Sequence, residues 1–198
     1  MKKFLSMMLV AVAIVSFSLP VHAAAINTNK TKNTASFEIK DVVEYSKTYG
    51  ICADRATTRI PIDLAIGKDM STNLVVEIAP QATAKASGTY NFTVSGNFYR
   101  TSDNVTVSVY GLSGSFEYTG SDTKITGKDS YHNSTAQDWT GTSRTSTSKE
   151  DSYHISVLKG DYTLFYKGKE NNTGWIKIAV SESGQYSVGG DYVSYNVN

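Results

Sequence analysis

Two histidines lie in near-identical surroundings and are the residues best suited to metal or acid–base chemistry. The phrase Asp129–His132 reads DSYH, and Asp151–His154 repeats it. Imidazole binds metals and exchanges protons near neutral pH. Paired across a hairpin, His132 and His154 would supply two metal ligands or one acid–base pair. A structural metal site needs further ligands, and none stands at a recognisable spacing, so we predict no metal at these weak candidates.

Strand geometry predicts which way these histidines point. Alternate side chains of a strand share a face, so Asp and Tyr of each phrase lie on one face, and Ser and His lie on the other. Tyr153 is followed by Ile155 and Val157 at the same spacing, which indicates that its face is buried. We therefore expect His132 and His154 on a solvent-exposed strand surface.

Aromatic side chains are the best candidates for ligand contact. Trp139 lies in a polar stretch, and Trp175 follows Gly174 at the start of an expected strand. Exposed aromatic rings stack on sugars and anchor protein interfaces. The alternative is ordinary packing, since aromatic residues are good strand formers. The residues predicted to bind a ligand are Trp139, Trp175, Tyr192 and Tyr195, and partial exposure is also expected for Tyr99 and Tyr110.

Enzyme signatures are missing from the sequence. It contains no G-x-S-x-G elbow, phosphate loop, dinucleotide fingerprint or EF-hand loop. Serine is so abundant that a Ser–His–acid combination can be drawn by chance. Asp129 and His132 are three residues apart, so on one strand they would point to opposite faces. We predict no catalytic residue and no cofactor, and we expect that the protein is not an enzyme.

The elements that position these residues are strands, because apolar and polar residues alternate with a period of two from residue 36 onward. Pro61 interrupts one such run and has no backbone donor, so its strand is expected at a sheet edge. Three alternating runs are expected to face a core: Ile60, Ile62, Leu64 and Ile66; Tyr90, Phe92 and Val94; Val105, Val107 and Val109. The pattern predicts an all-β antiparallel β-sandwich, immunoglobulin-like or jelly-roll-like, of roughly nine to eleven short strands.

Residues 130–150 form the most polar part of the chain. The segment 140–148 reads TGTSRTSTS. Hydroxyl side chains keep an exposed edge strand soluble, and a run without apolar periodicity is also typical of a loop. This segment is therefore either an exposed edge strand or a long mobile loop.

The first 23 residues have the three parts of a secretory signal peptide. Two lysines are followed by an apolar run, and Val21-His22-Ala23 offers a small-residue cleavage site. The run is shorter than the roughly 20 residues that a spanning helix needs, and it is typical of a bacterial signal. We predict cleavage after Ala23, a flexible leader at 24–35 and a single sandwich domain at 36–198. A small separate unit at 36–80 is the alternative.

Composition narrows the function. The chain has 19 Lys and Arg against 18 Asp and Glu. It therefore lacks the excess of basic residues that a nucleic-acid partner would require, and we expect no such partner. Cys52 is the only cysteine, which excludes an intramolecular disulfide, and we expect a buried thiol. The sequence has no second long apolar run after the N-terminal one, so we predict no transmembrane segment there. We therefore expect a released extracellular protein, a non-catalytic binding module for an unknown protein or glycan partner. The alternatives are a carbohydrate-binding module, and a small secreted enzyme or toxin-like effector.

Overall fold

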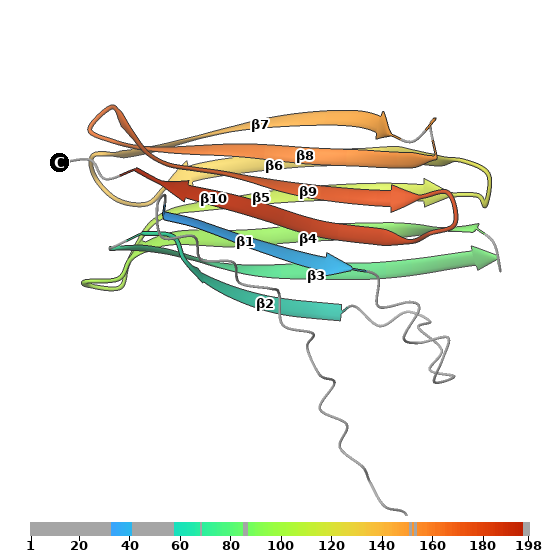
Figure 1. The fold of residues 1–198 in the computed structure, drawn as a ribbon, viewed down its shortest axis with the longest axis horizontal. Helices are drawn as coiled ribbons and strands as arrows, with labels where there is room; N and C mark the ends of the chain where they lie inside the picture. The colour runs from blue at the N-terminus through green and yellow to red at the C-terminus, as the bar shows by residue number, and fades with distance from the viewer. Residues whose placement is uncertain are drawn as a thin grey trace, which may run out of the picture.

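The protein is built from strands alone in the part of the chain that the structure describes (Figure 1). The computed structural model describes residues 33–40, 58–67, 69–84, 87–150, 152 and 154–195. The strands are β1 (Asn33–Lys40), β2 (Thr58–Ala65), β3 (Met70–Ala84), β4 (Ser87–Arg100), β5 (Val105–Tyr118), β6 (Thr123–Ser134), β7 (Trp139–Glu150), β8 (Ile155–Tyr166), β9 (Lys169–Ser181) and β10 (Tyr186–Ser194).

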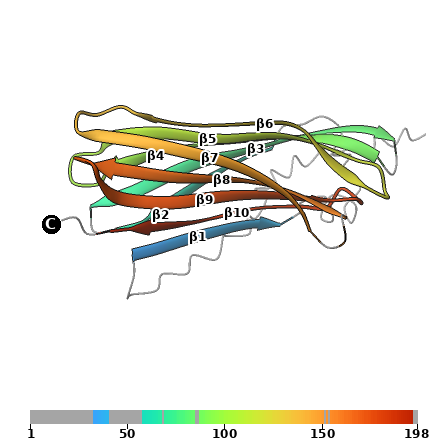
Figure 2. The same cartoon turned by 90° about the horizontal axis from the view of Figure 1, so that it is seen from above.

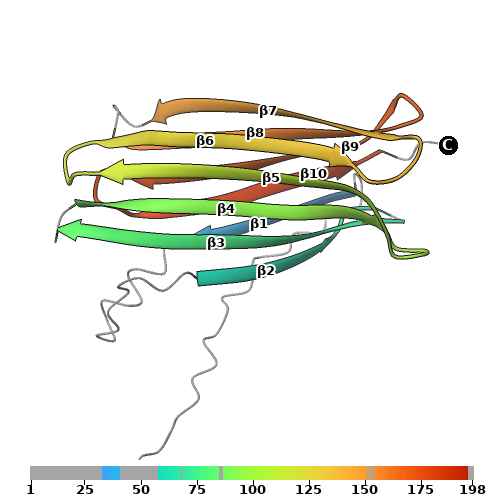
Figure 3. The ribbon, with the colours of Figure 1, turned by 180° about the vertical axis from the view of Figure 1, so that it is seen from behind.

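The strands form two five-stranded antiparallel sheets packed face to face. Sheet A has the order β1-β10-β9-β8-β7 and lies in front in Figure 1. Sheet B has the order β2-β3-β4-β5-β6 and lies in front in Figure 3. The antiparallel β-sandwich that the sequence predicts is confirmed. The strand order refines that prediction, since β2–β6 form one meander and β7–β10 form the other, with β1 added beside β10. Immunoglobulin-like and jelly-roll sandwiches instead contain Greek keys.

The edges of the sandwich are polar or interrupted strands. β2, which carries Pro61, is an edge of sheet B, as its missing backbone donor predicts. On the opposite side, β6 and β7 are the edges of the two sheets, and the chain passes between the sheets at 135–138. The polar stretch is thus an ordered edge strand rather than a long loop. Figure 2 shows β6 and β7 diverging from their connection.

The core lies between the sheets and is rich in aromatic rings. Phe92 and Phe116 meet edge to face at 5.5 Å between ring centroids, and Tyr110 and Tyr162 lie 4.9 Å apart. Burying each such side chain stabilises the fold by about 1.5–3 kcal/mol. The largest fully buried side chains are Tyr110, Tyr162, Tyr192, Phe92, Phe98, Phe116, Ile66, Leu74, Ile78, Leu112, Leu158 and Leu164. The alternating faces predicted for β2 and β4 are confirmed.

The prediction for β5 holds for Val107, which is buried, but is wrong for Val105, because the strand contains a bulge. The pairing of β4 with β5 shifts register between Phe98 and Tyr99, where Val107 is the extra residue. Two residues of a bulged strand oppose one on its neighbour, so the inward face changes phase here. Val105 is exposed, and Tyr110 is fully buried rather than partly exposed.

The N-terminal predictions are only partly within the described residues. The signal peptide, its cleavage site and Cys52 lie outside them. β1 begins at Asn33, so the last residues assigned to a flexible leader belong to a strand. The described residues of 36–80 lie in β1, β2, β3 and the turn between β2 and β3, and the three strands are hydrogen-bonded within the two sheets. No helix of the described part is long and apolar enough to cross a membrane.

Candidate functional site

His132 is buried between the sheets, and the prediction of an exposed side chain was wrong. Its exposed fraction is 7%. Its Nδ1 lies 3.0 Å from the Thr142 carbonyl oxygen and its Nε2 lies 3.1 Å from Ser108 Oγ. A carbonyl only accepts, so Nδ1 carries the proton and Nε2 accepts from Ser108. Burial lowers the pKa of His132. The imidazole therefore acts as a neutral structural bridge between β6 and β7.

His154 is exposed, as the sequence predicts, and lies far from His132. Its Nδ1 pairs with a carboxylate oxygen of Glu182. His132 contacts the start of β7, whereas His154 follows the end of that strand, so about 25 Å of extended chain separates the two sites. Ser156, two residues further along the chain, is buried. Within the described residues, no cluster of three potential metal ligands occurs.

Two of the four aromatic residues predicted to bind a ligand are core residues. Trp139 is 8% exposed, and its ring lies 4.9 Å from that of Tyr166. Tyr192 is fully buried, and its hydroxyl lies 3.0 Å from that of Tyr110. Neither side chain presents a face to solvent, so neither is available to stack on a ligand at the surface. Trp139 is surrounded by polar residues in the sequence, so its neighbours do not indicate that its side chain points into the core at the start of β7.

The other two predicted aromatic residues lie on the outer face of sheet A. Trp175 stands between its cross-strand partners Asp161 and Asp191. The Lys159 ammonium lies 5.6 Å from the indole centroid and pairs with Asp161 at 2.6 Å, so a charged side chain already covers the ring. Partial burial raises the pKa of Asp191. Tyr195 is 43% exposed at the end of β10.

An exposed tyrosine on the opposite face was not predicted. Tyr131 of β6 is 41% exposed on the outer face of sheet B, directly opposite Gly111 of β5. A Cβ at Gly111 would lie 2.5 Å from a ring carbon of Tyr131. The distal edge of the ring therefore lies over the glycine. The sequence indicated a buried face for Tyr131, and the structure reverses it because His132 takes the inward position.

Uncharged polar side chains surround this ring. Three rows of direct cross-strand partners cross β4, β5 and β6 on this face: Asn97, Val109 and Asn133; Ser95, Gly111 and Tyr131; Thr93, Ser113 and Asp129. Amide groups and hydroxyls both donate and accept hydrogen bonds. We call these nine residues the Tyr131 platform. Its one carboxylate is Asp129, at the sheet edge.

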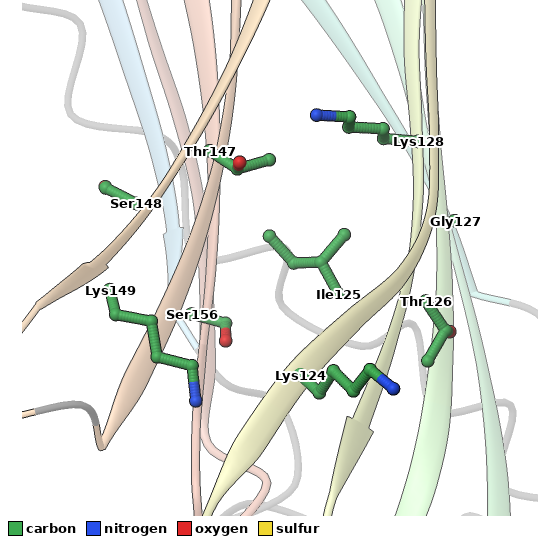
Figure 4. Close-up of a pocket in the computed structure, with 9 residues that line it drawn as sticks. All are labelled: Lys124, Ile125, Thr126, Gly127, Lys128, Thr147, Ser148, Lys149 and Ser156. Atoms are coloured by element: carbon green, nitrogen blue, oxygen red, sulfur yellow. The ribbon is translucent and has the colours of Figure 1, made fainter.

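A groove opens at the side of the sandwich where β6 and β7 diverge. It has a volume of about 490 Å³ and is lined by Lys124–Lys128 of β6, Thr147–Lys149 of β7 and Ser156 of β8. Figure 4 shows Ile125 and Lys128 projecting from β6 toward Thr147. We call these nine residues the lysine groove. Its volume lies within the range of small-molecule sites, about 300–1,000 Å³.

Contacts that β7 makes with β6 and with the turn before β6 define the two ends of the lysine groove. At one end, Ser130 Oγ and Thr145 Oγ1 share a hydrogen bond of 2.5 Å. At the other end, Lys149 Nζ pairs with Asp122 at 2.5 Å, and this hydrogen bond is the largest cause of the lowered pKa of Asp122. Between these contacts the strands separate, and the inward side chains of both strands meet solvent.

Comparison of the chain with protein-family models, with curated proteins and with solved structures finds no match. The function therefore has to be argued from the geometry of the surfaces. Two features that carry that geometry had weak sequence signals. The pairing of Gly111 with Tyr131 can be predicted only if the register of β5 and β6 is known. The two inward lysines of the lysine groove are far apart in the sequence.

Proposed function

We propose that the protein is a secreted, non-catalytic module that binds a neutral glycan through the Tyr131 platform. The observation that carries the proposal is a partly exposed aromatic ring that lies over Gly111 on the outer face of sheet B. The C–H groups on one face of a sugar ring are weakly positive and pack on the negative face of an aromatic ring. A flat, rigid sheet holds that ring in place before a ligand arrives.

The neighbours of Tyr131 complement sugar hydroxyls. Asn97, Asn133, Ser95 and Ser113 surround the ring on three strands. Sugar hydroxyls, like these side chains, both donate and accept, so a pyranose ring on Tyr131 finds partners on either side. Amides and aliphatic hydroxyls do not ionise near neutral pH. Such side chains favour binding over acid–base chemistry.

Trp175 is the weaker candidate for the same role. Its indole face is occupied by the Lys159 ammonium, which also holds Asp161. A sugar would have to displace this cation before stacking. The Tyr131 ring lies on a glycine and needs no such displacement. This difference favours sheet B over sheet A as the glycan-binding face.

A glycan array followed by calorimetric titration of the best neutral oligosaccharide tests the proposal. Tyr131→Ala should weaken binding by about fivefold or more, because stacking on an aromatic side chain contributes about 1–3 kcal/mol. Tyr131→Phe should bind within about threefold of the parent protein, since it retains the ring face. Tyr195→Ala is the matched control, an exposed tyrosine of the other sheet. Equal losses for Tyr131→Ala and Tyr195→Ala, or no neutral glycan bound, would refute the proposal.

Export is part of the same proposal and has its own test. The basic and apolar N-terminus followed by Val21-His22-Ala23 supports cleavage after residue 23. N-terminal sequencing of protein collected from the culture medium should begin at Ala24. A product that begins at Met1, or that stays with the cells, would contradict export by this signal.

A further inference from the structure

We infer that the lysine groove is a second binding site, which takes the sulfate or carboxylate group of an acidic polysaccharide. The inference is independent of the Tyr131 platform, because the groove is formed by the inner faces of β6 and β7 and by Ser156. It starts from an imbalance of charge. The residues that line the groove include three lysines and no aspartate or glutamate.

Two of these lysines occupy positions whose side chains point between the sheets. Lys128 pairs directly with Gly114, and Lys149 pairs directly with Ser156. The partner of Lys128 has no side chain, and Figure 4 shows the lysine extending across the groove toward β7. Lys124 lies at the rim and points away from the groove (Figure 4). The two inward lysines thus bring positive charge to one concavity from opposite strands.

The two inward lysines differ in how far carboxylates near the groove compensate their charge. Asp122 pairs with Lys149 at the end of the groove. Asp129 follows Lys128 in the chain, but it lies opposite Ser113 on the outer face of sheet B and so points away from the groove. Lys128 has no ion-pair or hydrogen-bond partner among the described residues. A concave surface lined by one sign of charge concentrates ions of the opposite sign, so the groove attracts an anion.

The remaining lining residues indicate what carries the anion. Ile125 packs against the core, and Figure 4 shows it between the two walls. Hydroxyl groups line the opposite side at Thr147 and Ser148. An apolar patch complements the C–H groups of a sugar ring, and neighbouring hydroxyls complement its hydroxyl groups. An ammonium group binds an oxyanion as a point charge. An acidic saccharide presents all of these groups together.

The position of the groove also suits a polymer. It lies along the open side of the sandwich, where β6 and β7 spread apart in Figure 2. Its walls are edge strands, so a long chain can enter and leave without threading through the protein. The alternative role for an inward lysine at a sheet edge is protection against edge-to-edge association. That role predicts aggregation when Lys128 is replaced, and no change of affinity for any ligand.

Titration with dextran sulfate and polygalacturonate, against neutral dextran and inorganic phosphate, tests the inference. Lys128→Gln should weaken binding of at least one acidic polymer by about tenfold, the loss of one charge-assisted contact. Asp122→Asn should strengthen binding, since it removes the carboxylate that competes for Lys149. Lys169→Gln is the matched control, because Lys169 is an exposed lysine at the start of β9.

Each outcome decides the matter. A loss confined to Lys128→Gln, with Asp122→Asn tighter than the parent, supports the inference. Equal weakening by Lys128→Gln and Lys169→Gln would show unspecific attraction and refute it. Binding of phosphate but of no acidic polymer would refute the saccharide, and so would a Lys128→Gln protein that aggregates with unchanged affinity. Tyr131→Ala should leave the binding of acidic polymers unchanged, which separates this site from the glycan platform.

Discussion

Lowering the pH from 7.5 to 5.5 is expected to destabilise the protein through His132. The imidazole is buried against the rings of Phe98, Tyr110 and Tyr162, at centroid distances of 5.7–5.9 Å. Its Nε2 accepts a hydrogen bond from Ser108, and protonation would remove that acceptor. Burial accordingly lowers the pKa of His132 below its ordinary value of 6.5. The folded protein therefore resists a proton that the unfolded chain accepts.

The sign and size of the effect follow from this difference. As the pH falls through 6.5, the unfolded chain binds more protons than the folded protein, so the free energy of unfolding decreases. If the folded imidazole stays neutral throughout, the loss between pH 7.5 and 5.5 is about 1.4 kcal/mol. Once the pH passes below the lowered pKa, His132 contributes no further loss. Stability is thus fully retained above pH 7.5.

Urea denaturation at half-unit pH steps measures this loss. His132→Gln should lower stability at every pH, by about 2–4 kcal/mol for the lost ring packing and hydrogen bonds, and should flatten the dependence between pH 7.5 and 5.5. His154→Gln is the control, because the exposed histidine makes no buried contact. A flat profile for the parent protein, or a profile that His154→Gln flattens instead, would refute the reasoning.

Three further substitutions test the packing of the sandwich by denaturant unfolding. Thr123→Val should leave stability unchanged or raise it by about 1 kcal/mol, because Thr123 Oγ1 is buried and makes no hydrogen bond with the described residues; a loss above that size would show a hidden partner. Gly190→Ala should cost about 2 kcal/mol or more, since its Cβ would lie 2.6 Å from the Trp175 carbonyl oxygen; an unchanged midpoint would contradict this contact. Tyr110→Phe should cost about 1–2 kcal/mol, because its hydroxyl lies 2.6 Å from that of Thr72 inside the core; a neutral result would mean that the buried hydroxyls do not depend on one another.

The sequence was sufficient for the fold wherever one face of a strand is continuously apolar. β4 shows this, since Tyr90, Phe92 and Val94 are all buried at the predicted spacing. A one-residue change of register would expose all three, so the pattern specifies the face strongly. The same reasoning failed in β5, where the bulge at Val107 changes the phase. A bulge adds a residue without a distinctive residue type, so the pattern of side chains does not reveal it.

The candidate sites were harder to predict, because they lie on strands whose two faces are both polar. In β6, Tyr131 and His132 are each partly apolar and partly polar, and hydropathy does not rank one above the other. The structure places the histidine inward because both its nitrogens find partners there, Thr142 and Ser108. Those partners come from strands 10 and 24 residues away in the chain. No local pattern carries that information.

The side of the sandwich formed by β6 and β7 differs physically from the rest, and this difference links the two proposed sites. Elsewhere the sheets are held together mainly by apolar and aromatic side chains, whereas here His132 and the Ser130–Thr145 pair bridge the edge strands. Polar bridges contribute less net stability than buried apolar surface of the same extent. Beside these polar bridges, and on the same strand, Lys128 faces the lysine groove and Tyr131 faces solvent. β6 is therefore less tightly packed than the central strands. Lys128 and Tyr131, which do not pack in the core, are available to contact a ligand.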